Sequence, residues 1–444
     1  MKETAVTFDF EKLTTLLYSM DSLNYSGKVH MITGLTVESA GPSVKIGEMC
    51  RIYTLRGDKS IQAEVVGFKD KRILLMPYGD LAGVGPGSRV VSTNRTLRVP
   101  VGMDFRGRVL DGLGAPIDGG PPVCASEYYP VENAPPNPLS RPRIHEILPL
   151  GVRAVDGLLT CGRGQRIGIF AGSGVGKSTL LGMIARNARS DVNVITLIGE
   201  RGREVNDFLQ KDLKAEGLAR SVIVVASSDQ PALVRSKSAM VGTSIAEYYR
   251  DRGLNVLLMM DSLTRYAMAQ REIGMAVGEP PVSRGYTPSV YTVMPKLLER
   301  AGNSEKGSIT ALYTVLVEGD DLNEPITDTA RGILDGHIVL SRDLANRNHY
   351  PAIDVLASVS RLMPDIVTTE HRQAAGRMKR LMAVYKDAED LINIGAYKAG
   401  SNAEIDEAFR LHGAIEAILC QEVDESCAFE DTVARLAALE EKNG

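Results

Sequence analysis

The chain has 444 residues, of which 44% are hydrophobic and 24% charged, a composition that is ordinary for a globular protein with a large buried core. At roughly 100–200 residues per domain, this length suggests two to four domains. The formal net charge of −4 and the pI of about 6.0 argue against a protein that binds nucleic acid mainly through its phosphates. Tryptophan is absent and aromatic residues make up only 5%, which also disfavours a protein that stacks single-stranded bases.

Five cysteines are scattered along the chain without the CxxC spacing of a zinc site or a redox pair. An odd, dispersed set is typical of reduced thiols in a cytosolic protein. The first residues contain no apolar run of signal-peptide length, and about 18 consecutive apolar residues occur nowhere in the sequence. We therefore expect a cytoplasmic protein whose membrane contact, if any, is peripheral.

The first hundred residues divide into an amphipathic segment and a β-rich domain. Residues 9–20 place apolar side chains at helical spacing, which suits either a helix packed on its own domain or a free arm that binds a partner. From about Gly27, short apolar, β-branched runs are separated by turn residues and predict a small β-barrel. The runs are 28–32, 35–37, 50–53, 63–68 and 72–76. We assign 1–26 to the segment and 27–98 to the barrel.

Between about residues 151 and 365, apolar strands alternate with helical patterns. The strands expected here are 166–170, 193–198, 222–226 and 256–260. Near-continuous apolar strands, each followed by a helix, predict a mostly parallel sheet with helices on both faces. The Pro-rich stretch 130–142 is best interpreted as an extended connector. Beyond residue 365 the strand signal fades, and three further segments are predicted to be helices, namely 372–394, 402–419 and 429–439.

A glycine-rich loop between the strand ending at Phe170 and a helical pattern is the strongest functional signal. Its candidate nucleotide-binding residues are Ala171, Gly172, Ser173, Gly174, Val175, Gly176, Lys177, Ser178 and Thr179. In a P-loop the glycines let backbone N–H groups surround the phosphates, and the helix N-terminus adds a favourable dipole. Lys177 would reach the β- and γ-phosphates of ATP, and the Ser178 hydroxyl would bind Mg²⁺. Ala171 stands where the general pattern has glycine. A mere glycine-rich turn is the alternative, but strand, loop and helix together favour a P-loop.

Two acidic residues at strand ends are candidates for the rest of the site. Asp261 closes the strand 256–260, where a carboxylate can hold Mg²⁺ through water, although a strand-end Asp is often only a helix N-cap. Glu200 follows the strand 193–198 and could orient the attacking water. For this role we expect its strand to lie next to the P-loop strand. The charges of 199–204 equally suit a solvated loop with surface salt bridges.

Longer sequence strings indicate a family. They are 170–178 (FAGSGVGKS), 199–205 (GERGREV), 261–272 (DSLTRYAMAQRE), 333–342 (ILDGHIVLSR), 350–354 (YPAID) and 394–397 (IGAY). Their order and spacing resemble those of the catalytic subunits of rotary ATP synthases and, more closely, of the type III export ATPases. The stretch 396–402 lacks the acidic run with which synthase subunits engage their rotor. The segments 227–233, 278–281 and 285–290 resemble flagellar export ATPases more than those of virulence injectisomes.

This resemblance implies an α/β fold in which a RecA-like P-loop NTPase core, 99–365, joins an N-terminal β-barrel to a C-terminal helical domain, 366–444. It implies that Glu200 polarises the lytic water, that Arg201 neighbours the γ-phosphate, and that Tyr350 packs on the adenine. Glu204 and Arg265 resemble supporting groups. Arg361 resembles an arginine finger that is supplied to the neighbouring subunit's site, so the active form would be a ring.

The resemblance also implies the biological task. A homohexamer would hydrolyse ATP with Mg²⁺ to energise flagellar type III export, releasing and unfolding chaperone-bound cargo at the export gate. It would bind a stator-like regulator through residues 1–26 and a stalk-like coiled-coil protein, lie at the inner face of the cytoplasmic membrane, and bind no nucleic acid. The alternatives are an injectisome ATPase, an RNA-translocating hexameric helicase, and a non-catalytic ring subunit.

Overall fold

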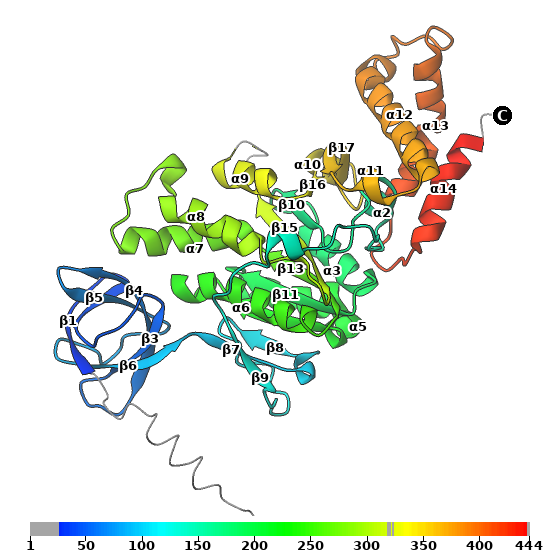
Figure 1. Cartoon of the computed structure of the whole chain (residues 1–444). Helices are drawn as coiled ribbons and strands as arrows, with labels where there is room; N and C mark the ends of the chain where they lie inside the picture. Colours follow the sequence, from blue (N-terminus) through cyan, green and yellow to red (C-terminus); the bar gives the residue numbers. More distant parts are fainter. Residues whose placement is uncertain (1–25, 318–320, 322–323, 442–444) are drawn as a thin grey trace, which may run out of the picture. The chain divides into compact units, whose positions relative to one another are not determined.

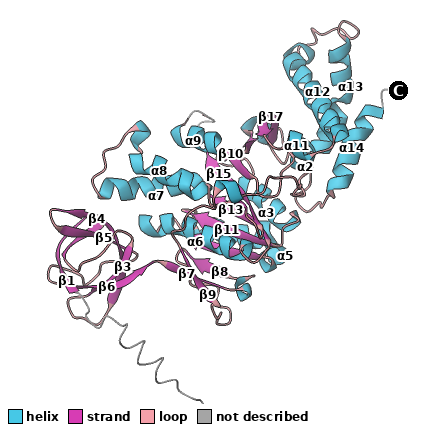
Figure 2. Ribbon diagram, viewed as in Figure 1, coloured by secondary structure: helices cyan, strands magenta, loops and turns pink. Residues whose placement is uncertain are grey.

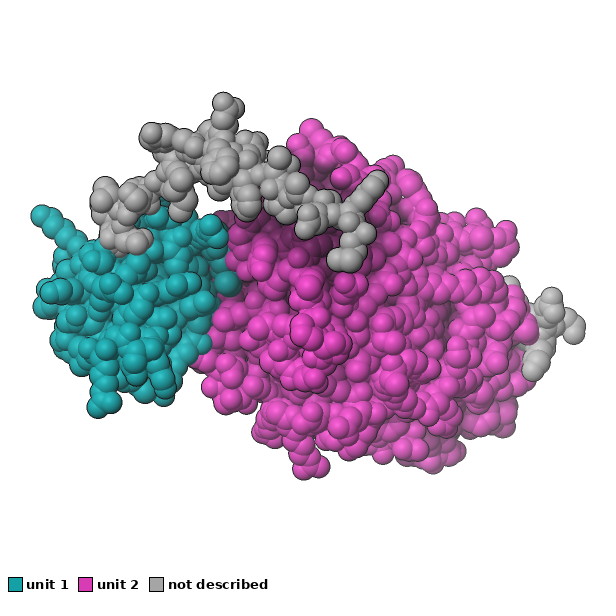
Figure 3. All heavy atoms as spheres, turned by 90° about the horizontal axis from the view of Figure 1, so that it is seen from below, with its two compact units in different colours: residues 1–97 teal, residues 98–444 magenta. Residues whose placement is uncertain are grey.

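The computed structural model describes residues 26–317, 321 and 324–441. The chain forms two compact units, residues 1–97 and residues 98–444 (Figures 1 and 3). The helix expected over 9–20 lies outside the described residues. The division between an ATPase domain and a helical domain near residue 365 falls inside the second unit and stays a prediction.

In the first unit, the described residues form a closed six-stranded antiparallel barrel with the strand order β1-β2-β5-β4-β3-β6. The strands are β1 (Ser26–Thr33), β2 (Thr36–Ala40), β3 (Glu48–Tyr53), β4 (Ser60–Lys69), β5 (Arg72–Pro77) and β6 (Arg89–Thr96). Alternate apolar side chains, such as Val37, Ile52 and Leu75, point into a small core of their own. The expected barrel is confirmed. Its closing strand β6 was missed because its second half, Ser-Thr-Asn-Arg-Thr, carries no apolar pattern.

The second unit is built on a sheet that has nine strands among the described residues (Figure 2). The main strand order is β17-β16-β10-β15-β13-β11-β12-β8, and β14 pairs with β15. The strands are β8 (Val109–Asp111), β10 (Arg166–Ala171), β11 (Val192–Ile198), β12 (Ser221–Ala226), β13 (Asn255–Asp261), β14 (Gly302–Asn303), β15 (Ser308–Leu316), β16 (Gly336–Leu340) and β17 (Ile353–Ser360). All pairings are parallel except those of β14 and β17.

Helices cover both faces of this sheet, as expected. Along β11, Ile195 and Leu197 pack in a core that includes Leu181 of α3. Thr196, between them, faces α6, where a Cβ on Gly242 would lie 2.0 Å from the Thr196 hydroxyl oxygen. Only glycine allows so close an approach of helix and strand. The helices of this region are α2 (Arg153–Leu158), α3 (Lys177–Asn187), α4 (Gly202–Asp207), α5 (Lys214–Ala219), α6 (Ala232–Arg250), α7 (Leu263–Ala276), α8 (Pro288–Leu298), α9 (Pro325–Ile333), α10 (Arg342–Asn346) and α11 (Met363–Ile366).

A buried ion pair, Arg300–Glu247, anchors the start of the Pro-rich connector to the second unit. The connector follows a two-stranded ribbon of β7 (Arg98–Val101) and β9 (Glu127–Pro130). The Arg300 guanidinium, 2.8 Å from the Glu247 carboxylate, donates to the backbone oxygen of Val131 at 2.9 Å. The connector is extended apart from one 3₁₀ turn at Pro138–Ser140.

The chain ends in three helices, α12 (Thr369–Asn393), α13 (Ala403–Leu419) and α14 (Phe429–Glu441), coloured orange to red in Figure 1. They lie within four residues of the expected boundaries. Thr368 and Asn402 cap the first two by accepting backbone N–H groups. The Arg153 guanidinium of α2 donates to the carbonyl oxygen of Ile418, which fixes the end of α13 to the sheet domain. No helix within the described ranges is both long enough and apolar enough to span a bilayer.

Candidate functional site

The glycine-rich loop joins β10 to α3 at the edge where the parallel strands end. Gly174 and Gly176 have φ angles of +79° and +89°, which residues with a Cβ rarely adopt. A Cβ at Gly174 would meet no atom within 4 Å, so the loop arches away from the rest of the domain there. Lys177 is the first residue of α3, and Ser178 lies in the same first turn. The loop therefore has the backbone form that surrounds phosphate groups.

Lys177 lies between two carboxylates. Its Nζ is 2.5 Å from Oδ1 of Asp261 and 3.4 Å from Oε1 of Glu200. All three side chains are largely buried. Although burial lowers the pKa of Lys177, the charges of Asp261 and Glu200 raise it above its usual range. The structure thus brings together Lys177, Glu200 and Asp261, which were predicted to be site residues from three separate sequence motifs.

The strand order explains why the two carboxylates meet, and it corrects one expectation. Glu200 follows β11 and Asp261 ends β13, and these strands are neighbours in which Leu197 pairs with Asp261. Both carboxylates consequently lie at the same edge of the sheet. The expectation that β11 lies next to the P-loop strand is wrong, because β13 and β15 separate β11 from β10. Strand order depends on long-range pairing, which local apolar runs do not specify.

Glu200 has an unusual protonation equilibrium. Burial, together with the nearby Asp261 charge, raises its pKa to about 7 against the opposing effect of Lys177. Glu204 also contributes to the rise, and its hydrogen bond with Glu200 lowers the pKa of Glu204. A carboxyl with a pKa near neutrality is suited to accept a proton from water. Gly199, with φ +68°, makes the turn that aims Glu200, and the stem of Arg265 packs against it.

Thr314 is a site residue that the sequence analysis missed. It lies in β15, between β10 and β13, and is fully buried. Its hydroxyl donates a 2.6 Å hydrogen bond to Oδ1 of Asp261, the same oxygen that Lys177 contacts. The nine-residue β-branched run Ser308–Leu316 was the available signal for this strand. Thr314 therefore sets the orientation of the Asp261 carboxylate.

Thr314→Val should lower kcat/KM for ATP by roughly tenfold to a hundredfold, because a hydrogen bond to a charged group contributes about 1.5–3 kcal/mol. Valine preserves the shape of threonine and removes only the hydroxyl. Thr314→Ser, which keeps the hydroxyl, is the matched control and should retain most activity. Steady-state ATPase kinetics and thermal unfolding of both variants check this. Equal kinetics of the valine and serine variants would show that the hydrogen bond has no catalytic role.

Tyr350, expected beside the adenine, lies just before β17 at the P-loop edge of the sheet. Its ring approaches the loop closely enough that a Cβ on Gly176 would be 3.5 Å from Cε1 of Tyr350. The residue is 40% exposed, which is high for a large aromatic side chain. The backbone N–H of Gln421, just beyond α13, donates to its carbonyl oxygen at 3.0 Å. An exposed ring against a P-loop is a suitable surface for a flat base.

Two expected site residues are not brought to the Lys177 cluster. The Arg201 side chain is 82% exposed and lies 3.6 Å from Glu204. Arg361 follows β17, which runs antiparallel to β16, with Ser360 opposite Gly336 at the start of that strand. Its backbone N–H donates to Asp335, whose own N–H donates to Arg166 at the start of β10. Arg361 is therefore at the edge where the parallel strands begin, opposite to the P-loop.

Comparison with known proteins agrees with this arrangement. Three family models match in order: the β-barrel domain of the ATP synthase alpha/beta family over 29–94, its nucleotide-binding domain over 151–360, and the T3SS EscN ATPase C-terminal domain over 367–438. The "Flagellum-specific ATP synthase" of Bacillus subtilis is 55% identical over 97% of this chain and 98% of its own. The "Type 3 secretion system ATPase" of Xanthomonas euvesicatoria is 53% identical over 93% of each chain.

The chain belongs to the type III export ATPases of the ATP synthase alpha/beta family. Its fold agrees with that of the assembled ATPase EscN from the enteropathogenic E. coli type III secretion system, with a TM-score of 0.87, 46% identity, and coverage of 93% of this chain and 99% of EscN. EscN has also been solved in complex with its central stalk EscO. This export ATPase thus has the expected fold class and enzyme class, an α/β P-loop ATPase with a barrel before the core and helices after it.

Proposed function

We propose that this export ATPase hydrolyses Mg²⁺-ATP in a closed homohexameric ring and energises flagellar type III export by releasing and unfolding chaperone-bound cargo at the export gate. The observation that carries the proposal is a type III secretion C-terminal domain joined to an intact Lys177–Glu200–Asp261 cluster. Family membership argues against an RNA-translocating helicase. The presence of both carboxylates and the P-loop lysine argues against a non-catalytic ring subunit.

Each site residue has a proposed role in hydrolysis. The P-loop N–H groups and Lys177 bind the phosphates, and Tyr350 holds the adenine. The Asp261 carboxylate and the Ser178 hydroxyl are hard oxygen donors that suit Mg²⁺, which neutralises phosphate charge when bound. Glu200 orients the lytic water and accepts its proton. Arg361 completes the site of the neighbouring subunit, and Arg201 lies at the rim of its own.

The ring and its partners are further parts of the proposal. The assembled EscN structure supports an oligomer, and the complex of EscN with its central stalk supports a stalk-like partner for this ATPase. A stator-like regulator at residues 1–26, chaperone–cargo complexes and peripheral attachment to the cytoplasmic membrane follow from the export role. No nucleic acid is required.

Deletion of residues 1–22 should leave basal ATP hydrolysis unchanged and abolish regulator binding, because Lys177, Glu200 and Asp261 all belong to the second unit. Pull-down of the regulator and ATPase assays of the deleted and full chains check this. Loss of the folded barrel in the deletion variant would show instead that the segment is part of the barrel core.

The biological task can be tested in the organism that carries the gene. Deleting the gene should abolish flagellar filaments and motility, and the wild-type gene should restore both. Complementation with Glu200→Gln at equal protein level should fail. If motility survives and secretion of virulence effectors is lost instead, the injectisome alternative is correct. The observation that supports this alternative is the 53% identity to the Type 3 secretion system ATPase of Xanthomonas euvesicatoria.

A further inference from the structure

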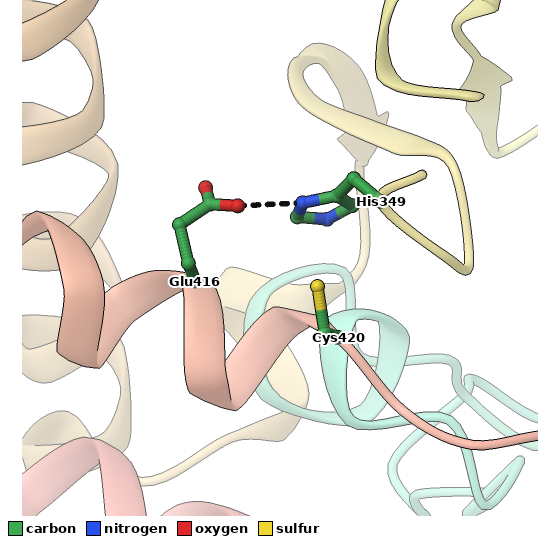
Figure 4. Close-up of side chains that lie close together, drawn as sticks. All are labelled: His349, Glu416 and Cys420. Atoms are coloured by element: carbon green, nitrogen blue, oxygen red, sulfur yellow. Dashed lines mark hydrogen bonds and ion pairs between the residues drawn. The ribbon is translucent and has the colours of Figure 1, made fainter. Parts of the chain in front are cut away.

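Three side chains of types that can ligate a metal, His349, Glu416 and Cys420, lie close together where the loop before β17 meets the end of α13 (Figure 4). His349 precedes Tyr350, in the loop between α10 and β17. Glu416 lies in the last turn of α13, and Cys420 is the residue that caps this helix, with its backbone N–H donating to the carbonyl oxygen of Glu416. The potential ligand atoms of the three residues, one nitrogen, one oxygen and one sulfur, all lie within 4.8 Å of one another.

The three side chains are already close and can be reached from outside. Nδ1 of His349 is 2.6 Å from Oε2 of Glu416, while His349 itself is buried. The Glu416 side chain is 38% exposed. Both residues line a cavity of about 190 Å³ between β17, α12 and α13. A small ion can therefore enter without unfolding of either segment.

We propose that His349, Glu416 and Cys420 bind Zn²⁺ or a similar borderline-soft divalent cation. Imidazole and thiolate ligands select such ions over Mg²⁺, which prefers six oxygen donors. Zn²⁺ takes nitrogen and oxygen ligands at about 2.0–2.2 Å and sulfur at about 2.3 Å. Tetrahedral binding therefore needs the His349–Glu416 contact of 2.6 Å to open by less than about 1 Å, and the Cys420 sulfur to move closer to the other two ligand atoms by about 1 Å. On binding, the Cys420 thiol releases its proton to solvent, and His349 binds through a ring nitrogen that carries no proton. Three protein ligands leave a fourth position for water.

The three residues come from two segments, the loop before β17 and the end of α13. Among the described residues, no other group of three or more such side chains lies close enough together to hold a metal ion. A bound ion would tie the loop that carries Tyr350 to the end of α13, next to the hydrogen bond from Gln421 to Tyr350. Binding itself does not depend on the proposed export function.

Titration of the full-length, nucleotide-free protein with Co²⁺ tests the proposal, because Co²⁺ reports a thiolate ligand by a near-ultraviolet charge-transfer band. We expect the band to saturate at one equivalent per chain and to disappear when Zn²⁺ is added. Cys420→Ser should lose the band. Cys427→Ser, which removes another partly buried thiol outside the group, should keep it. His349→Gln and Glu416→Gln should weaken Zn²⁺ binding by about tenfold or more.

Thermal unfolding supplies an independent readout. Zn²⁺ should raise the Tm of the wild type and of Cys427→Ser and leave the Tm of Cys420→Ser unchanged, while the metal-free proteins show that each variant is folded. The proposal is overturned if the wild type gives no thiolate band, if Cys420→Ser keeps the band, or if His349→Gln binds Zn²⁺ as tightly as the wild type.

Discussion

Arg361→Ala should lower kcat for ATP hydrolysis by about 10³–10⁵ while nucleotide binding persists, because an arginine finger stabilises charge that develops only in the transition state. The positions of Arg361 and the P-loop imply that this finger would act between two subunits. Arg361 lies where the parallel strands begin, and the P-loop lies where they end. The six residues of β10 separate these edges by roughly 15–20 Å, farther than an arginine side chain extends. If Arg361 takes part in catalysis, it acts on a neighbouring site.

A mixture of two inactive variants tests this directly. Glu200→Gln subunits keep Arg361, and Arg361→Ala subunits keep Glu200. In randomly mixed rings of equal proportions, about a quarter of the sites would combine both intact residues, so ATPase activity should return on mixing. Arg372→Ala, an exposed arginine of α12, is the matched control and should be fully active alone. Normal hydrolysis by Arg361→Ala would remove the finger from the mechanism.

Glu200→Gln should bind ATP as the wild type does and lose hydrolysis by about 10²–10⁴, the usual contribution of a general base. Glutamine has nearly the same shape but cannot accept the proton of the attacking water. Lys177 keeps its contact with Asp261 in this variant, so the phosphate-binding loop should remain intact. Equilibrium binding of a fluorescent ATP analogue and single-turnover hydrolysis separate the two effects.

Glu216→Gln is the matched control for this prediction, because Glu216 is an exposed carboxylate on α5 whose side chain is 72% accessible. It should leave kcat unchanged. If Glu200→Gln hydrolyses ATP at the wild-type rate, another group orients the water, and the raised pKa of Glu200 reflects only its burial and the neighbouring carboxylates. If it instead loses nucleotide binding, its role is to position Lys177.

Several features could be predicted because they depend on residues that are contiguous in the sequence. The strand, glycine loop and helix around Lys177 occur together in a short segment, and φ angles such as that of Gly176 follow from local glycine placement. The C-terminal helices were found within a few residues from their apolar period and polar caps. The positions of Glu200 and Asp261 just after apolar runs marked both as strand-end candidates for the site, and carboxylates that end parallel strands share one edge of the sheet.

The fold class, the P-loop and the family could all be inferred from the sequence, because each depends on residues that are neighbours along the chain. The strand order could be found only from the folded structure, which places β13 and β15 between β11 and β10 and brings Thr314 to Asp261. The folded structure also shows that Arg361 lies at the sheet edge opposite to its own P-loop, and that His349 contacts Glu416, 67 positions further along the chain. These relations arise from pairing and packing between distant segments, and local periodicity carries no information about which distant segments meet.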